Sequence, residues 1–155
     1  SEEDRVAKEV LTELLEKMGI DAEITASLSE PSRPDADAPV LLDVRGQNLN
    51  VLIGRRGETL ASLQYVTRLI TSRRIQQRAN IIVDVAGYKS QRSDRLEKLA
   101  KRMANQAVSQ NRTITLEPMP PNERRMVHLA LRNREDVYTK STGEGDARKV
   151  MIIPK

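Results

Sequence analysis

The stretch Val-Leu-Ile-Gly-Arg-Arg-Gly-Glu-Thr-Leu at residues 51–60 decides the predicted fold of this 155-residue chain. Gly54 and Gly57 bracket Arg55 and Arg56, with an apolar half-helix before them and an amphipathic helix after them. Glycine has no Cβ, so the backbone can turn tightly here and approach a ligand closely. The N-terminus of the following helix favours an anion, and the arginines add donors that match a phosphate. The stretch therefore predicts a loop that holds phosphate.

The four residues of the loop leave an alternative open. Gly-x-x-Gly patterns recur by chance, so a plain joint between two helices with a solvated arginine pair explains residues 54–57 at least equally well. The two interpretations differ in what they require of the surrounding sequence, including its distribution of charge.

Positive charge is concentrated after an acidic beginning. The net charge of +4 is the sum of −8 over residues 1–43 and +12 over residues 44–155. A basic region of this size favours a polyanion partner, although charge that serves only solubility is the alternative.

The remaining composition is that of a globular protein with an aliphatic core. Phe, Trp and Cys are absent and only three Tyr are present. Disulfides, cysteine-based zinc or redox sites and a platform of several stacked aromatics are thereby excluded. No apolar run approaches membrane-spanning length, so we expect no membrane insertion. The absence of cysteine fits a reducing, cytoplasmic location.

The first half of the chain predicts three helical and three extended segments. Helical periodicity or turn chemistry marks residues 4–18, 49–53 and 58–73, whereas alternating or apolar runs mark strands at 21–28, 40–45 and 79–85. The predicted buried stripe of the third helix is Leu60, Leu63, Val66, Leu69 and Ile70. The continuous apolar run in the last strand predicts burial on both of its faces.

This order of elements around Gly54–Gly57 resembles the type II KH fold, a three-stranded sheet with helices. The resemblance covers residues 4–86 and sets the expected boundary of a first domain at 1–86. It implies that Gly54, Arg55, Arg56 and Gly57 clamp the sugar-phosphate backbone of a single strand of about four nucleotides. An apolar groove beside the loop would then receive bases, with contributions from Leu49, Ile53 and Leu60 unless these belong to the core.

The second half predicts a long helix over 90–110, a strand over 113–117 and a helix that begins near Pro121. A hairpin of 137–141 with 148–153 closes the chain. Arg124 and His128 share one helical face, which Arg132 continues, and Val127, Ala130 and Leu131 form the opposite, buried one. His128 is the only histidine; structural hydrogen bonding is its commoner role, and neither a nucleophile nor a metal-ligand spacing accompanies it.

The segment Met-Pro-Pro-Asn-Glu-Arg-Arg-Met-Val-His at residues 119–128 resembles the domain named for an Arg and a His separated by three residues. That family binds single-stranded DNA or RNA. The resemblance implies a small α+β domain over 87–155 in which Arg124, His128 and Arg132 contact a nucleic-acid backbone.

A KH domain followed directly by an Arg-x-x-x-His domain resembles the arrangement in the bacterial Jag family. Its members are also called KhpB or EloR, the SpoIIIJ-associated proteins. The family implies a cytoplasmic RNA-binding protein linked to cell elongation, division or sporulation. Because the residues offer neither a metal cluster nor a base–nucleophile pair, we expect an α+β, non-enzymatic protein that binds single-stranded RNA without cofactor or metal. It also implies KH-mediated pairing, as a homodimer or with a single-domain KH protein, and a further N-terminal domain before this chain. A protein-interaction scaffold remains the alternative, and an RNA-processing enzyme is the weakest hypothesis.

Overall fold

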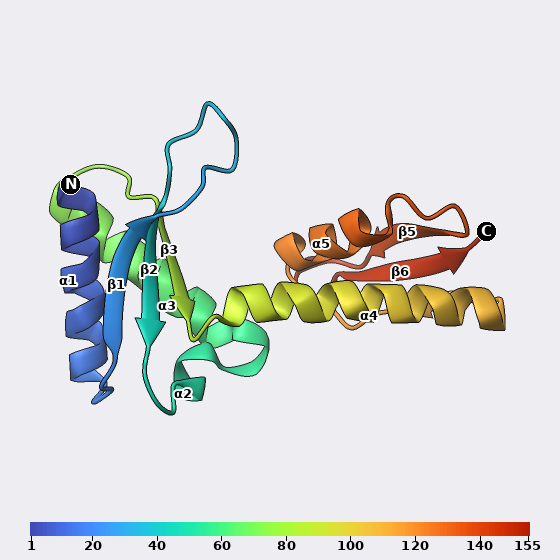
Figure 1. Cartoon of the computed structure of the whole chain (residues 1–155), viewed down its shortest axis with the longest axis horizontal. Coiled ribbons are helices and arrows are strands. Elements are labelled where there is room, and N and C mark those ends of the chain that lie inside the picture. The colour runs from blue at the N-terminus through green and yellow to red at the C-terminus, as the bar shows by residue number, and fades with distance from the viewer. The chain divides into compact units, whose positions relative to one another are not determined.

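The computed structural model describes all 155 residues, which form two compact units, Ser1–Lys89 and Ser90–Lys155. Each unit combines helices with its own three-stranded sheet (Figure 1), so the α+β prediction is confirmed. None of the helices is long and apolar enough to span a membrane.

Unit 1 contains three strands, three α-helices and one short 3₁₀ turn. They are α1 (Glu2–Lys17), β1 (Glu23–Leu28), β2 (Val40–Arg45), α2 (Asn50–Ile53), the turn Arg55–Gly57, α3 (Glu58–Ile75) and β3 (Ile81–Val85). Strand β2 is central and pairs antiparallel with β1 and parallel with β3. The predicted strand over 40–45 is confirmed to the residue, with Val40, Leu42 and Val44 buried on one face.

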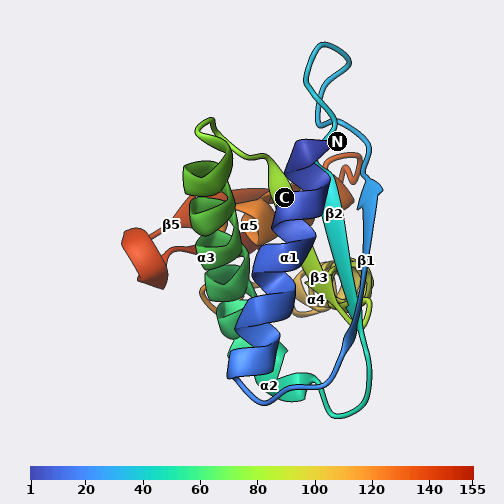
Figure 2. The ribbon, with the colours of Figure 1, turned by 90° about the vertical axis from the view of Figure 1, so that its left-hand side faces the viewer.

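The core of unit 1 is aliphatic and lies between the sheet and its helices. Figure 2 shows α1 and α3 side by side, with β2 and β1 to the right of α1. Leu11, Leu42, Leu52, Leu60 and Val83 are among its fully buried members. This packing gives α3 a fixed position on the sheet, and the loop at residues 54–57 leads directly into that helix.

The predicted buried stripe of α3 is wrong at two positions. Leu60 and Leu63 are buried, but Val66 and Leu69 are exposed, and the inner face continues through Thr67 and Thr71. Each threonine hydroxyl donates 2.7 Å to the backbone oxygen four residues earlier, so no polar group is left unsatisfied by its burial. Counting only apolar residues therefore rotated the predicted face of this helix.

Strand β3 also differs from its prediction. Ile81, Val83 and Val85 are buried, but Ile82 and Asp84 are only half-buried. Helices cover one face of this sheet, so its apolar run does not indicate burial on both faces.

Unit 2 begins within the long helix α4 (Tyr88–Gln110). It continues with β4 (Ile114–Thr115), α5 (Pro121–Leu131), β5 (Val137–Thr142), a 3₁₀ turn (Gly145–Ala147) and β6 (Lys149–Pro154). Strand β6 is central and antiparallel to both neighbours. Pro121 occupies the first turn of α5, as predicted.

The core of unit 2 joins both helices to the sheet. Small side chains of α4 (Ala100, Ala104 and Ala107) allow close approach, and Val127 of α5 and Ile152 of β6 are fully buried against them. Ala130 is only partly buried, so the inner face of α5 is formed by Glu123, Val127 and Leu131. A carboxylate in this row was not predicted.

Candidate nucleic-acid interface

The loop between α2 and α3 has a backbone that only certain residues can adopt. Gly54 has φ 71° and ψ −175°, Arg56 has φ 56°, and Gly57 has φ 78°. The combination at Gly54 is essentially restricted to glycine, and the other two lie in the left-handed region. Such a run of uncommon angles is typical of ligand-binding turns.

Both glycines are also required by their neighbours. A Cβ on Gly54 would overlap the side chain of Thr59, whose own Cβ would lie only 2.9 Å away. A Cβ on Gly57 would lie 2.8 Å from ring atom Cε2 of Tyr88. The loop is therefore held in place by Thr59 on one side and by Tyr88 on the other.

The loop presents positive charge at the start of a helix. Arg55 is exposed and Arg56 is half-buried, and no side chain caps the N-terminus of α3. The N-terminal end of the 18-residue helix α3 favours an anion. The exposed carboxylate of Glu58 in the first turn meets part of this preference. The geometry suits one phosphate group held by backbone and guanidinium together.

The apolar residues beside the loop belong to the core, which is one of the two roles considered for them in the sequence. Leu49 and Leu60 are 4% and 2% exposed and belong to the core of unit 1. Ile53 is partly buried and packs against the same core. These side chains therefore fix α2 and α3 around the loop and do not form the wall of an open groove.

In unit 2, Arg124 and His128 lie on α5 and are held from below by β5. Arg124 Nη1 donates to Ser141 Oγ at 3.2 Å, and His128 Nδ1 lies 2.6 Å from Thr139 Oγ1. Thr139 and Ser141 are two residues apart in β5, so their side chains lie on the same face of the strand, and both hydroxyls face the helix. The structure thus brings the predicted Arg and His together and adds two anchoring hydroxyls.

The electrostatics of this pair are unusual. Partial burial, and then the positive charge of Arg124, hold the pKa of His128 below its usual value. Arg124 Nε is buried without a hydrogen-bond partner. An unpaired donor of this kind is costly and is found where a site serves function rather than stability.

Arg132 lies just beyond α5 and is exposed, whereas Arg124 and His128 bond to Ser141 and Thr139. It can supplement the pair as an exposed positive charge.

An ion pair between a buried carboxylate and a half-buried guanidinium supports α5 from the side of α4. Arg92 Nε and Nη2 donate to Glu123 Oε2 and Oε1 at 3.0 and 3.1 Å, and the Glu123 side chain is 7% exposed. Two parallel bonds of this kind fix orientation as well as distance. An acid in the first turn of a helix is common on dipole grounds alone, so the sequence carried no signal for this role.

The sequence interpretation also missed Thr139 and Ser141. Their only signal is that they alternate in a strand, which is shared by many surface hydroxyls.

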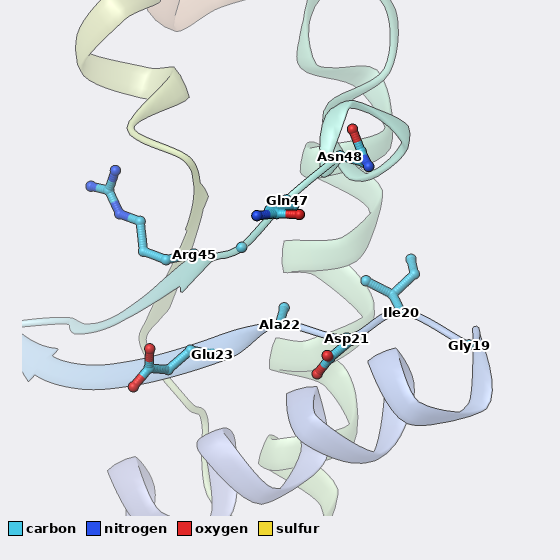
Figure 3. Close-up of a pocket in the computed structure, with 9 residues that line it drawn as sticks. Gly19, Ile20, Asp21, Ala22, Glu23, Arg45, Gln47 and Asn48 are labelled. Carbon is cyan, nitrogen blue, oxygen red and sulfur yellow. The ribbon is translucent and has the colours of Figure 1, made fainter.

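A hollow in unit 1 lies between Gly19–Glu23 and Arg45–Asn48. Figure 3 shows its labelled side chains pointing in different directions rather than toward a common centre. Two of them are carboxylates, Asp21 and Glu23, which disfavour an anion. No group of three or more His, Cys, Asp or Glu residues in the structure could hold a metal ion.

Two family models match the chain, one in each unit. Residues 8–85 match the KH domain of KhpA/KhpB, and residues 94–154 match the domain named for an Arg and a His separated by three residues, the Arg-x-x-x-His domain. The first match covers half of the chain.

Curated relatives match across both units. A protein of Clostridium symbiosum named RNA-binding protein KhpB is 34% identical over 149 residues, which are 96% of this chain and 65% of that protein. Its namesake in Bacillus subtilis is 34% identical over 86% of this chain and 65% of its own length. That of Lactiplantibacillus plantarum is 26% identical over 96% of this chain and 44% of its own length. The chain thus spans slightly less than two thirds of the first two relatives.

Proposed function

The chain belongs to the KhpA/KhpB family of KH-domain proteins and carries an Arg-x-x-x-His domain, and on this premise we propose that it binds single-stranded RNA without catalysing a reaction. Each unit is taken as one domain with one backbone-binding site. Gly54, Arg55, Arg56 and Gly57 contact phosphate in the first domain. Arg124 and His128, with Arg132 as an added charge, contact it in the second.

The observation that carries this proposal is the loop at residues 54–57. Its glycines have no room for a Cβ, an exposed arginine stands between them, and an uncapped helix follows. Extended single-stranded RNA offers evenly spaced phosphates and accessible bases, which such a loop can clamp without aromatic platforms. The relatives named for RNA binding agree with this chemistry.

The second domain supports the same function through side chains. The lowered pKa of His128 favours the neutral ring in the free protein, and a phosphate beside the ring would favour the protonated form. Arg124 adds a permanent positive charge. If both domains act on one strand, the second binding event is intramolecular and overall affinity rises by about a hundredfold over either domain.

A binding titration tests the proposal. Labelled single-stranded RNA, the same sequence in DNA and an RNA duplex are titrated with wild type, Arg55→Asp plus Arg56→Asp, and Arg124→Ala plus His128→Ala. With about four phosphates engaged, the logarithm of affinity falls with the logarithm of salt at a slope of about −3. We expect single strands to bind best, each double variant to weaken binding, and the loop variant to flatten the slope.

The matched control is Arg73→Asp plus Arg78→Asp, which makes the same charge change on exposed residues at the far end of α3 and beyond it. Equal losses in the control and in the loop variant would reduce the effect to net charge and overturn the clamp. Absence of binding to any single strand would overturn the function itself.

One observation favours a second candidate, a protein-interaction scaffold that pairs through the first domain. Tyr65, Val66 and Leu69 are 56%, 38% and 49% exposed on the outer side of α3. Light scattering of wild type and Leu69→Glu tests this pairing. A dimer that Leu69→Glu dissociates, together with no RNA binding, would make the scaffold the better description.

The cellular setting of the proposal is a cytoplasmic regulator of cell elongation, division or sporulation, which rests on the family resemblance alone. Cell length and spore counts in a deletion strain complemented with wild type or with Arg55→Asp plus Arg56→Asp test whether RNA binding serves this role.

A further inference from the structure

A polar cluster lies where α3, β3 and the start of α4 meet, within unit 1. Gln64 Oε1 accepts two hydrogen bonds, from the backbone N–H of Val83 at 2.9 Å and from Lys89 Nζ at 2.6 Å. Asp84 Oδ1 accepts the backbone N–H groups of Val85 at 2.9 Å and of Lys89 at 3.2 Å. The positions of one amide and one amine are thereby fixed against the edge strand of the sheet.

This arrangement leaves two donors side by side. Because both incoming bonds use Oε1, the amide nitrogen of Gln64 carries no partner within the protein. The Lys89 ammonium has three N–H groups and gives one of them to Gln64. Partial burial lowers the pKa of Lys89, and the carboxylate of Asp84 opposes this shift. The cluster thus presents a neutral donor next to a cationic donor.

The cluster is directly connected to the loop at residues 54–57. Tyr88, which precedes Lys89, lies against Gly57 so closely that its ring would be 2.8 Å from an added Cβ. Gln64 follows Gly57 by two helical turns, or about 10 Å of helix rise. That separation is comparable with the reach from a phosphate to the hydrogen-bonding edge of its own base.

We propose that Gln64 and Lys89 determine the base specificity of this interface and select a base with two adjacent hydrogen-bond acceptors, guanine or cytosine. The inference rests on the proposed function, because the loop must hold the phosphate that places the base. Guanine offers O6 and N7, and cytosine offers O2 and N3. Adenine places its amino donor beside the ring acceptor on either edge, and uracil separates its carbonyls by N3–H. Each would therefore set one donor against another.

The substitution Gln64→Glu tests this pairing with little disturbance to the fold. It keeps the Oε1 acceptor for Val83 and Lys89 and replaces the amide donor with a negatively charged acceptor. Lys89→Met removes the cationic donor and keeps the length of the side chain. Gln77→Glu, on an exposed residue after α3, is the matched control for the added negative charge.

The experiment measures anisotropy of the full chain with four labelled RNA octamers. They are a uridine octamer and three octamers with one central uridine replaced by cytidine, guanosine or adenosine. We expect the cytidine octamer, the guanosine octamer or both of these octamers to bind about tenfold more tightly than the adenosine and uridine octamers. This is the range of one good two-point contact. Gln64→Glu and Lys89→Met should each abolish this preference, and Gln77→Glu should keep it.

The outcomes separate this inference from the function on which it rests. Equal binding of all four octamers by wild type overturns the base selection and leaves the RNA clamp intact. A preference that survives both Gln64→Glu and Lys89→Met also overturns it. Absence of binding to every octamer overturns the proposed function together with the inference. Circular dichroism of each variant shows whether the fold is retained, and Lys89→Met decides the matter if Gln64→Glu unfolds.

Discussion

In the first unit the backbone of residues 54–57 has uncommon φ angles and Arg55 points into solvent, whereas in the second unit α5 is an ordinary helix whose functional side chains are anchored to β5. The loop conformation depends on the absence of a side chain at Gly54 and Gly57, since neither glycine has room for a Cβ. The Arg124–His128 pair is shaped by atoms that are present, namely two hydroxyls and an ion pair. Adding atoms should therefore damage the first site, and removing them should damage the second.

The largest expected effect comes from Gly54→Ala. The new Cβ would overlap Thr59 and the residue would remain in a backbone region essentially restricted to glycine. Together, strain and overpacking should lower the free energy of unfolding by about 3 kcal/mol, and the fraction that still folds should lose affinity for RNA. Urea unfolding followed by circular dichroism measures the first effect, and an RNA titration measures the second.

Gly19→Ala is the matched control. Gly19 has the same φ of 71° but nothing within 4 Å of an added Cβ. Its substitution should cost about 1 kcal/mol from backbone strain alone and leave RNA affinity unchanged. Equal losses of stability in both variants would show that Thr59 does not shape the loop.

The second site should depend on Glu123. Glu123→Gln removes the charge that two donors of Arg92 contact, in a position that is 7% exposed. Removing one partner of a buried pair costs about 3 kcal/mol or more, and the partial exposure of Arg92 reduces this to about 2 kcal/mol. Glu97→Gln, which breaks the exposed pair with Lys101, should cost less than about 0.5 kcal/mol. Thermal unfolding of both variants measures the difference in stability. A similarly small loss of stability in each variant would show that the Arg92–Glu123 pair does not anchor α5.

The contrast between the sites also explains what the sequence could predict. Glycine spacing and the order of elements indicated the loop and the KH fold, because local backbone demands are recorded in residue type. The Arg124–His128 face followed from helical spacing in the same way. Thr139 and Ser141 approach that face only through tertiary packing, so no local pattern indicates them.

Two errors have different causes, one local and one tertiary. Thr67 and Thr71 are buried because their hydroxyls bond to the backbone of their own helix, an option that a count of apolar residues ignores. Glu123 is buried because Arg92, 31 residues earlier, neutralises it. The threonines find their partners within their own turn of helix, which apolar periodicity does not count, whereas the partner of Glu123 becomes visible only when α4 is placed beside α5.

The next effect concerns pH. The pKa of His128 lies below that of an unfolded histidine because of burial and Arg124. The unfolded chain therefore takes up this proton first as the pH falls. The contribution of His128 to stability is complete above the usual pKa of about 6.5 and is lost as the pH falls through the lowered value. His128→Gln should lack this loss between neutral and mildly acidic pH when unfolding is compared at several pH values.

RNA should act on the same proton in the opposite direction. A phosphate beside His128 favours the charged ring, so the pKa should rise on binding and RNA affinity should increase as the pH falls toward 6. Because the chain has one histidine, a proton NMR titration reports this pKa without overlap. A pKa that RNA leaves unchanged would place His128 outside the interface.

The smallest expected effect separates anchoring from charge. Thr139→Val keeps the shape of the side chain and removes the hydroxyl that lies 2.6 Å from His128 Nδ1. The ring should then sample more orientations, and the affinity for RNA should fall by about two- to fivefold, as for the loss of one neutral hydrogen bond. Thr115→Val, on the exposed side of β4 in the same sheet, is the control and should bind as wild type does. Both variants keep every charge, so a loss confined to Thr139→Val can arise only from the position of the ring. Equal affinities would instead mean that Arg124 and the net charge suffice, and that the second site is less dependent on its anchors than the first is on its glycines.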